Sequence, residues 1–499
     1  MFYAKPLKFK KTSYYNVDFT SFSLAPNTTK DQKLMPFARA YKSYNFDATS
    51  GALECGNGFA DLKMPMFYGD EQNERTILMP NNVEIKKVWH YKYYNNLNAQ
   101  KEHMVLFYCS DNKVYYSYVI SISNVTFPIS TDLSFTSTPT ACNYRLGEND
   151  VMIFTSPTDN MTVFCPELEL QVVESAPKIE KMCVHNERLF AVTHDDKQTL
   201  RFSDDLNPTN WTSSLTEGGS ISFADGLGDI GEVVSFGDYL YLVRDYGITR
   251  LSTFGSQSDF CASNVFCSSA KIFANSCANC GDCLMFLSKD GVFAFDGSSA
   301  QKIDLGVDEL FEGMYNENAA AAFYRGKYFL ACRLNFDEGQ IGCEYSTYQN
   351  NALIEIDLLA SNFNITRGVD ICSLASVEEA NASKLVACFG SVFQTKLGQL
   401  TNDGCLFGEP LEKLWQSPKT NLGHPNKKKF IRDLIISTTG PISVQIEADD
   451  ATKTYQFSGS LKPQVVHPKM VCENVKISFS SCDETCHISW PRAVVGIVG

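Results

Sequence analysis

The sequence lacks long apolar runs. No stretch of about 18 consecutive apolar residues occurs, so no transmembrane helix is expected. Residues 1–11, MFYAKPLKFKK, carry positive charge but no apolar core of the length that a secretory signal needs. We therefore expect cytosolic synthesis, with the 18 cysteines as reduced thiols. Many of them sit in strand-like apolar runs and behave there as small buried hydrophobes.

An excess of basic charge is also missing. The chain has 43 basic and 57 acidic residues, for a net charge of −14. Such a surface does not wrap nucleic acid by releasing counterions, although it would let DNA pass without holding it. With 44% hydrophobic and 12% aromatic residues among 499, the composition is that of a globular protein of two or three domains, or one large all-β body with an appendage.

The usual sequence patterns of catalysis are absent. There is no phosphate-binding or dinucleotide-binding glycine loop. The seven histidines are scattered, and no Ser-His-Asp or Cys-His arrangement follows from their spacing. No run of base-stacking aromatic and basic residues marks a nucleic-acid module. We therefore predict a protein that is not an enzyme, with no catalytic residue, no cofactor-binding residue and no resident metal or cofactor.

What the sequence does contain is a repeated strand pattern, clearest in residues 183–252. Short β-branched and aromatic runs alternate with tight turns rich in Gly, Asn and Asp, and helical spacing of apolar residues is poor. Two modules of this design follow one another. The predicted strands are 183–185, 189–193, 232–236, 239–243 and 248–252, separated by turns at Asn186-Glu187, Gly237-Asp238 and Tyr246-Gly247.

The pattern recurs from about residue 85 to residue 405. Successive first turns lie 36 to 55 residues apart, which is typical of a β-propeller with several strands in each blade. We predict about seven blades, with six or eight as alternatives. Longer loops at 253–269 and 335–351 are expected on the rim. The candidate first turns are Asn98, Asp150, Asn186, Gly237, Gly281, Gly326 and Asn381.

The predicted organisation has three parts. Residues 1–80 form an extended N-terminal arm with lead-in strands, 81–405 the propeller, and 406–499 a C-terminal antiparallel β-sandwich. In the last part, alternating strands follow one another at roughly ten-residue spacing. The one sharp basic run, residues 427–429, is interpreted as the solvated beginning of a strand.

Residues 203–211, SDDLNPTNW, resemble the Asp box of sialidases and related propellers. Ser203, Asp205 and Trp211 fit that pattern, whereas Asn207 replaces its glycine and the tryptophan comes one residue late. An Asp box is a structural turn in which the Asp caps backbone amides and the aromatic packs between strands. A sialidase would also need an arginine cluster and a tyrosine nucleophile, and arginine is scarce here.

Cys277, Cys280 and Cys283 form the tightest cysteine cluster. A structural zinc ion takes four ligands, so we favour a structural role in which Cys283 begins a core strand. A metal site or a disulfide are the alternatives. Cys482 and the adjacent Cys486-His487 point to a metal still less, because neighbouring residues of a strand face opposite sides.

Three segments together carry a family resemblance. They are ARAYKSYNFDATSGALECGNGFADL (38–62), NERLFAVTHDDKQTLRFSDDLNPTNW (186–211) with the DGLGD and VVSFGDYLYLVRDYGITRL that follow, and LWQSPKTNLGHPNKKKFIRDLIIST (414–438). In this order they resemble the propeller-bearing tail nozzle or tail-hub proteins of short-tailed bacteriophages. The matching positions are architectural and supply no catalytic residue. The high cysteine count and the 335–351 insertion depart from the family.

The resemblance implies a structural virion protein, made in the host cytoplasm and located in the tail. It implies a homo-oligomeric ring, commonly a hexamer, below the tail adaptor and portal and next to tail-fibre proteins. DNA would leave through the bore without specific binding, and no membrane insertion is expected. The alternatives are a receptor-binding or baseplate propeller that recognises host glycans, a glycosidase, and a cellular scaffold. The scaffold is disfavoured because regular Trp-Asp or kelch repeats are missing.

Overall fold

The structure is a computed structural model of an all-β protein. Its described residues form strands and turns, with short 3₁₀ helices such as η3 (Gln257–Asp259) and η4 (Asp308–Phe311). No helix among them is long and apolar enough to cross a membrane. The described residues are 13–18, 22, 26–28, 31–32, 35, 39–64, 75–76, 79–80, 82–96, 99–120, 123–128, 133–213, 218–336, 347–360, 362–378 and 383–498.

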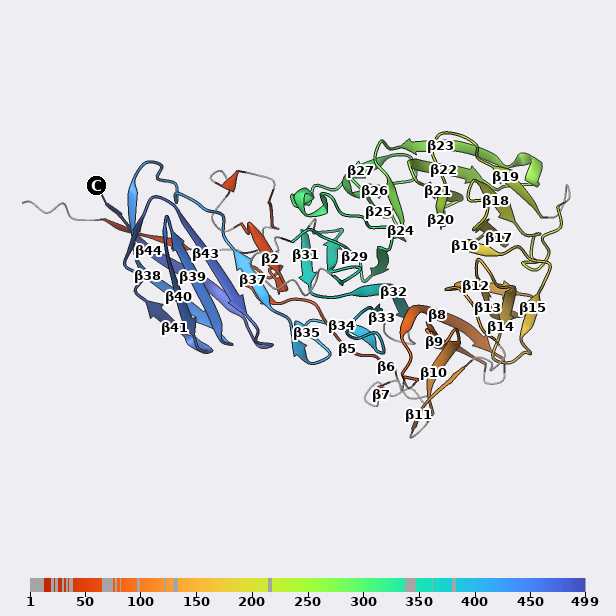
Figure 1. Cartoon of the computed structure of the whole chain (residues 1–499), viewed down its shortest axis with the longest axis horizontal. Helices are drawn as coiled ribbons and strands as arrows, with labels where there is room; N and C mark the ends of the chain where they lie inside the picture. The colour runs from red at the N-terminus through yellow and green to blue at the C-terminus, as the bar shows by residue number, and fades with distance from the viewer. Residues whose placement is uncertain are drawn as a thin grey trace, which may run out of the picture.

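Most of the chain folds into four-stranded antiparallel sheets, each made from one continuous segment (Figure 1). Within each sheet the strands follow in chain order, as successive hairpins do. The first three sheets are β8 (Ile85–Asn95), β9 (Gln100–Cys109), β10 (Val114–Ile120) and β11 (Ser123–Pro128); β12 (Thr140–Leu146), β13 (Asn149–Thr155), β14 (Met161–Phe164) and β15 (Gln171–Val173); and β16 (Ile179–His185), β17 (Arg188–Thr193), β18 (Thr199–Phe202) and β19 (Gly219–Ser222).

The next three sheets repeat this design. They are β20 (Ile230–Phe236), β21 (Tyr239–Arg244), β22 (Gly247–Ser252) and β23 (Cys261–Cys267); β24 (Ile272–Asn279), β25 (Leu284–Ser288), β26 (Gly291–Phe295) and β27 (Ala300–Lys302); and β28 (Ala320–Tyr324), β29 (Lys327–Cys332), β30 (Ala352–Asp357) and β31 (Asn362–Arg367). Strands such as β17 (RLFAVT) are buried along nearly their whole length because both faces of each sheet pack against neighbouring sheets. The result is a propeller-like all-β body.

The predicted first turns are confirmed at four positions. Asn186, Gly237, Gly281 and Gly326 connect the first and second strands of their sheets, and all four have positive φ. A β-hairpin turn that matches the twist of its strands needs such residues. The candidate Asp150 was wrong: it lies inside β13, and Gly147, with φ +60°, makes the turn. Asn98 and Asn381 lie outside the described residues.

Two further expectations need correction. Residues 253–269 were expected as a loop, but they contain β23 (CASNVFC), a largely exposed outer strand in which Ser263 and Asn264 interrupt the apolar residues and so weaken the strand signal. The basic run at 427–429 is not fully solvated. Lys429 is buried, and its Nζ donates to the carbonyls of His424 (2.8 Å) and Glu473 (2.6 Å). Of the second expected loop, 337–346 lie outside the described residues.

A last sheet joins the two ends of this region. It combines β32 (Ile371–Glu378), β33 (Ser383–Phe389) and β34 (Leu397–Thr401) with β5 (Gly58–Asp61) from the N-terminal part. Strand β5 pairs antiparallel with β34, from Gly398↔Asp61 to Thr401↔Gly58, and continues to β35 (Cys405–Leu406) and β36 (Glu409–Pro410). The first strands of successive sheets neighbour one another, and β32 lies against β8, so the succession closes.

The C-terminal region adds two five-stranded sheets that share one core. Trp415, Phe479, Leu434 and Val495 are fully buried between them. One sheet contains β1 (Tyr14–Asp18), β44 (Ile488–Val498), β38 (Lys428–Thr438), β41 (Ser460–Val466) and β42 (Met470–Cys472). The other contains β2 (Lys42–Tyr44), β37 (Lys413–Gln416), β43 (Val475–Ser481), β39 (Ile442–Ala448) and β40 (Ala451–Phe457).

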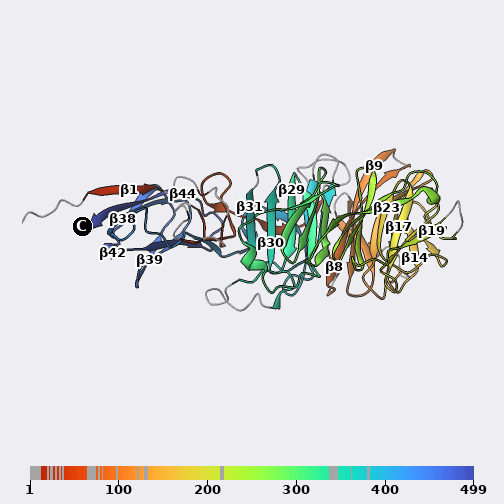
Figure 2. The same cartoon turned by 90° about the horizontal axis from the view of Figure 1, so that it is seen from above.

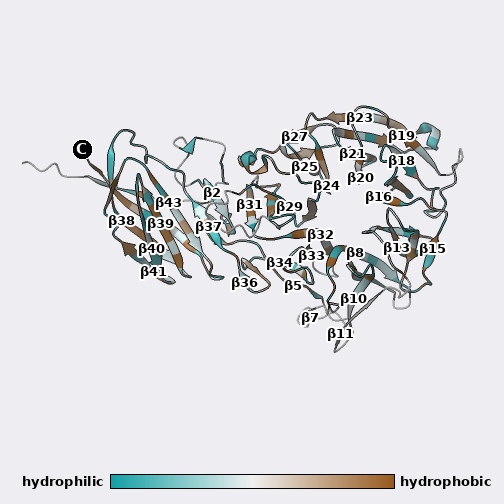
Figure 3. Cartoon of the chain, viewed as in Figure 1, coloured by the Kyte–Doolittle hydropathy of each residue, from teal (hydrophilic) through white to brown (hydrophobic). Residues whose placement is uncertain are grey.

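The N-terminal part therefore contributes strands to both regions. Strands β1 and β2 belong to the C-terminal sheets and β5 to the closing sheet, with short pairs β3 (Phe46–Asp47)–β4 (Glu54–Cys55) and β6 (Lys63–Met64)–β7 (Arg75–Thr76) beside them. Seen from above, the two regions lie side by side along the long axis (Figure 2). Hydrophobic residues concentrate in the strands of both regions, and the connecting turns are largely hydrophilic (Figure 3).

Candidate functional site

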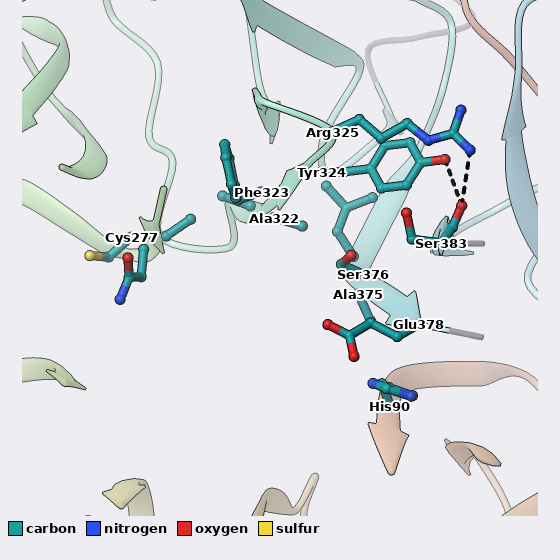
Figure 4. A pocket seen from close by; sticks show the side chains of 14 residues that line it. His90, Cys277, Ala322, Phe323, Tyr324, Arg325, Ala375, Ser376, Glu378 and Ser383 are labelled. Carbon is teal, nitrogen blue, oxygen red and sulfur yellow. Dashed lines mark hydrogen bonds between the residues drawn. The ribbon is translucent and has the colours of Figure 1, made fainter. Parts of the chain in front are cut away.

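A cavity of about 570 Å³ lies where strands of the first, fifth, sixth and closing sheets meet. Strands β8, β24, β28 and β32 form its walls, together with Arg325 in the turn after β28 and Ser383 at the start of β33 (Figure 4). These are the first strands of their sheets, so the cavity lies near the centre of the propeller-like body. Its lining combines apolar and polar side chains, among them Phe323, Leu374, Asn279, His90 and Glu378.

A stacked pair of histidines lies on one side of the cavity. His90 on β8 and His103 on β9 have ring centroids 5.2 Å apart and nearly parallel planes, and His90 Nε2 is 3.0 Å from His103 Nδ1. Burial, followed by the neighbouring imidazole, lowers the pKa of His90 to about 4, and burial also lowers the pKa of His103. Both rings are therefore neutral at pH 7, so one donates the shared hydrogen bond and the other accepts it.

Glu378 supplies the negative charge of the site. Its carboxylate lies 2.9 Å from Lys92 Nζ, and this hydrogen bond lowers the pKa of Glu378. Figure 4 shows the carboxylate directed into the cavity, above His90. Because Lys92 is on β8 and Glu378 ends β32, the ion pair bridges the first and the closing sheets.

The rim is formed by the turn after β28. Tyr324 Oη donates to the Ser383 carbonyl at 2.8 Å, and the Arg325 guanidinium packs over the Tyr324 ring, 5.1 Å from its centroid (Figure 4). The hydrogen bond to Ser383 joins the sixth sheet to the closing sheet. The cavity thus presents the Glu378 carboxylate, the neutral imidazole of His90, the Arg325 guanidinium and the Asn279 amide, which together can exchange hydrogen bonds with a polar ligand.

A second polar cluster joins the first strands of other sheets. Lys181 Nζ lies 2.8 Å from Glu232 Oε2 and 2.6 Å from Asn275 Oδ1, so β16, β20 and β24 are linked in a row. Asn275 in turn donates to the Glu317 carbonyl at 2.6 Å. Burial, reinforced by the positive charge of Lys181, lowers the pKa of Lys87 on β8 to about 8. Ionic groups therefore tie consecutive sheets together near the centre.

Neither cluster was predicted from the sequence. His90, Asn279, Arg325 and Glu378 are far apart in the chain and meet only because the succession of sheets closes. A faint signal was present in β8, where His90 and Lys92 alternate with the buried Trp89, Tyr91 and Tyr93. Polar residues on alternate positions of an otherwise buried strand indicate a face that meets a polar space.

The Asp-box-like segment is a structural turn. Trp211 packs against the core between the second and third sheets, and its Nε1 donates to the Pro208 carbonyl at 2.9 Å. The capping acceptor is Asn207, whose Oδ1 receives the Thr209 amide at 3.2 Å and hydroxyl at 2.8 Å. Ser203 is fully buried and accepts the Leu189 amide at 3.0 Å. The role expected for Asp205 is thus taken by the residue that replaces the glycine.

The cysteines singled out in the sequence are free thiols. Cys280 and Cys283 flank the turn between β24 and β25, and Cys277 lies within β24 and lines the cavity. Cys482 is exposed and Cys486 buried, and His487 Nδ1 lies 3.6 Å from Glu54. Within the described part of the chain, no group of three or more His, Cys, Asp and Glu side chains is arranged to hold a metal ion.

Fold and site together define an all-β protein of propeller-like sheets with a polar cavity at their centre. No family model and no curated protein matches the sequence. Among solved structures, the chain is similar to Raptor of Chaetomium thermophilum, with a TM-score of 0.45 and 8% sequence identity. That similarity covers 72% of this chain and 29% of the Raptor chain, so this chain spans less than a third of that protein. A similarity of this size carries no inference about function.

Proposed function

We propose that the chain is a non-enzymatic structural protein of a bacteriophage tail. Six copies would form a ring that continues the DNA channel below the portal and adaptor. This ring would adjoin the tail fibres. In this proposal the body is a seven-bladed β-propeller with a C-terminal β-sandwich. The order of first strands from β8 to β32, with β5 completing the last sheet, supports seven blades. The shared core of the two C-terminal sheets supports the sandwich.

The observation that carries the proposal is the position of the segments that resemble the tail proteins. The first segment, 38–62, forms β2 to β5, and the third, 414–438, forms β37 and β38. Strands β2 and β37 pair directly, with Ser43 opposite Trp415. Segments at opposite ends of the sequence thus build one junction between the propeller-like body and the C-terminal sheets. This supports a resemblance that reflects a shared architecture.

The surface of the sheet β1–β44–β38–β41 supports a contact between subunits. Its strands carry exposed apolar side chains, with Leu461 83%, Val471 53%, Val465 48% and Tyr14 45% exposed. Val465 lies opposite Ile435, and Val471 opposite Phe430. These exposed apolar side chains, named the apolar face, suit burial against another protein, and the Asp18–Arg492 ion pair lies on the same side of the sheet. A closed ring also needs a second, different surface on the neighbouring copy.

The charge of the chain is compatible with a conduit. A net charge of −14 repels the DNA backbone, so DNA that passes through the ring would not be retained. The proposal therefore predicts that the protein binds DNA weakly, although DNA passes through the ring. Retention of double-stranded DNA at physiological salt would contradict a conduit with an acidic wall.

Mass photometry and negative-stain microscopy test the proposal on the full-length protein, alone and mixed with particles that lack a tail. The expected result is closed rings with a central hole, or added density at the capsid vertex. A monomer at high concentration that adds nothing to the vertex would overturn the proposal.

Two variants test whether the apolar face forms the contact between subunits of the ring. Val465→Lys and Val471→Lys place charges on that face and are expected to shift rings to monomers. Leu359→Lys is the matched control, because Leu359 is 93% exposed in a turn of the propeller-like body. Equal loss of rings in all three variants would mean that the face is not the contact.

A second candidate function, recognition of host glycans by a receptor-binding tail protein, is favoured by the central cavity. Its volume of about 570 Å³ and its polar groups, including Asn279, His90 and Glu378, suit a polyhydroxylated ligand. Glycan-array binding by the wild-type chain that is lost in Glu378→Gln, without ring formation, would favour this function over the conduit.

A further inference from the structure

Cys280 and Cys283 form a C-x-x-C pair held in one tight turn. The β24–β25 ladder ends at Asn279↔Leu284, so both cysteines lie in the connecting loop. The Cys280 amide donates to the Cys283 carbonyl at 2.9 Å, which brings the two residues together across the turn. Gly281 has φ +88° and open space around it, so it supplies the bend at no steric cost.

The two thiols have different surroundings. Cys280 is 6% exposed and belongs to the core that the fifth and sixth sheets share, whereas Cys283 is half-buried at the edge of that core. An incoming molecule therefore reaches Cys283 more easily than Cys280. One more accessible and one shielded sulfur is the arrangement in which an attacking and a resolving cysteine work together.

The two thiols also interact with each other. A hydrogen bond from Cys280 stabilises the Cys283 thiolate and lowers the pKa of Cys283 to about 7. Two other thiols show the opposite shift. Burial raises the pKa of Cys277 in the same hairpin, and of Cys482, although Cys482 is exposed.

We propose that Cys280 and Cys283 are a redox-active dithiol that small disulfides such as oxidised glutathione convert to an intramolecular disulfide. The spacing, the closed turn and the unequal exposure of the two sulfurs carry this inference, which is independent of the role in a tail. It assigns a chemical activity to the turn beside the central cavity, whose wall includes Cys277 and Asn279.

The reaction proceeds by two exchanges. The Cys283 thiolate attacks one sulfur of oxidised glutathione, forms a mixed disulfide and releases one glutathione thiolate, which takes up a proton. The Cys280 thiol then loses its proton to water and attacks the Cys283 sulfur, and the second glutathione thiolate leaves. The dithiol has lost two electrons and two protons, and one oxidised glutathione has become two reduced molecules.

Titration of the full-length protein with oxidised and reduced glutathione tests the proposal. After acid quenching and alkylation, trypsin releases the peptide 272–289, which contains all three cysteines of the cluster, and fragmentation spectra locate any bond. The expected product has lost two hydrogen atoms and carries a Cys280–Cys283 link. At pH 7, Cys283 is expected to react with an alkylating agent at least about tenfold faster than Cys482, because a larger fraction of it is thiolate.

Three variants separate the outcomes. Cys277→Ser is the matched control and should still form the disulfide. Cys280→Ser should stop at the mixed disulfide on Cys283, and Cys283→Ser should leave Cys280 unmodified. A peptide that stays reduced while Cys482 is glutathionylated would overturn the proposal. So would a disulfide that Cys277→Ser abolishes, or a mixed disulfide that persists in the wild-type chain.

Discussion

The third and fourth sheets differ from the closing sheet in how their strands are supplied. The third and the fourth sheet are each made from a continuous segment. The first two strands of the third sheet join through the tight turn at Asn186, and those of the fourth sheet through the turn at Gly237. The closing sheet needs β5, which pairs with β34 across most of the chain. The local sheets therefore depend on turns, whereas the closing sheet depends on contacts between segments that only the complete fold brings together.

A local turn and the junction between the propeller-like body and the C-terminal sheets place their polar residues differently. Asn186 sits at an exposed turn and donates one hydrogen bond, to Thr253 Oγ1 at 2.9 Å. Asn45, just before β3, also has positive φ but is 3% exposed. It receives the Arg367 amide at 2.6 Å and donates to the Glu412 carbonyl at 2.7 Å. The junction thus relies on buried hydrogen bonds, so its loss should cost more than the loss of a local turn.

Asn45→Ala should give the largest effect. It removes the hydrogen bonds of Asn45 to the Arg367 amide and the Glu412 carbonyl and forces alanine into the left-handed region, at a cost of about 4 kcal/mol. Asn186→Ala, the matched control, should cost about 1–2 kcal/mol. Chemical denaturation measures both free energies of unfolding. Equal losses would remove the distinction between junction and local turn.

Gly58→Ala should follow. A Cβ at Gly58 in β5 would lie 2.6 Å from the Cys405 amide nitrogen, against backbone that cannot move aside, and we expect a loss of about 3 kcal/mol. Gly226, in a loop before the fourth sheet, has open space around it, so Gly226→Ala should change stability little. Melting temperatures compare the two. A Gly58→Ala protein as stable as wild type would mean that β5 does not pack closely against β35.

The His90–His103 pair of the first sheet, which faces Glu378 of the closing sheet, should make stability sensitive to acid. Burial holds the pKa of His90 near 4, below its value in the unfolded chain. Between those two values the unfolded chain binds a proton that the folded chain does not, so the free energy of unfolding falls as the pH falls. Between pH 7 and pH 5 we expect a loss of about 1 kcal/mol, reduced by partial exposure of the ring.

His90→Gln should flatten that part of the pH profile, which denaturation at a series of pH values measures. His194→Gln in the third sheet is the control, because the His194 side chain is 60% exposed. Parallel profiles for wild type and His90→Gln would show that the pair contributes nothing to acid sensitivity.

The smallest effect should come from the Lys92–Glu378 ion pair. Its side chains are 43% and 59% exposed, so solvent screens the attraction and a double-mutant cycle with Lys92→Met and Glu378→Gln should give less than about 1 kcal/mol of coupling. The same cycle on Lys181 and Glu232, which are 21% and 23% exposed, should give a larger value. The reverse order would mean that closure depends on surface charge.

The strands of the local sheets could be predicted from the sequence because hairpin turns leave a local signal. The predicted runs 189–193 and 239–243 fall within β17 and β21. Strand β23 was missed because it is an exposed outer strand in which Ser263 and Asn264 interrupt the apolar residues, and Asp150 was misplaced because Gly147 made the turn three residues earlier. The partner of β5 could not be predicted, because no local pattern in residues 58–61 indicates that they pair with residues 397–401. The cavity residues could not be predicted for the same reason, because they come together only when the succession of sheets closes.

Closure by β5 also sets an order of events during synthesis. Strand β5 leaves the ribosome early, but its partner β34 is made only after the six local sheets and part of the closing one. At typical translation rates that interval is on the order of tens of seconds, during which Phe59 has no hydrophobic neighbours from the closing sheet. The nascent chain therefore carries an exposed, unpaired strand for most of its synthesis, a target for chaperones and a route by which two chains could exchange strands.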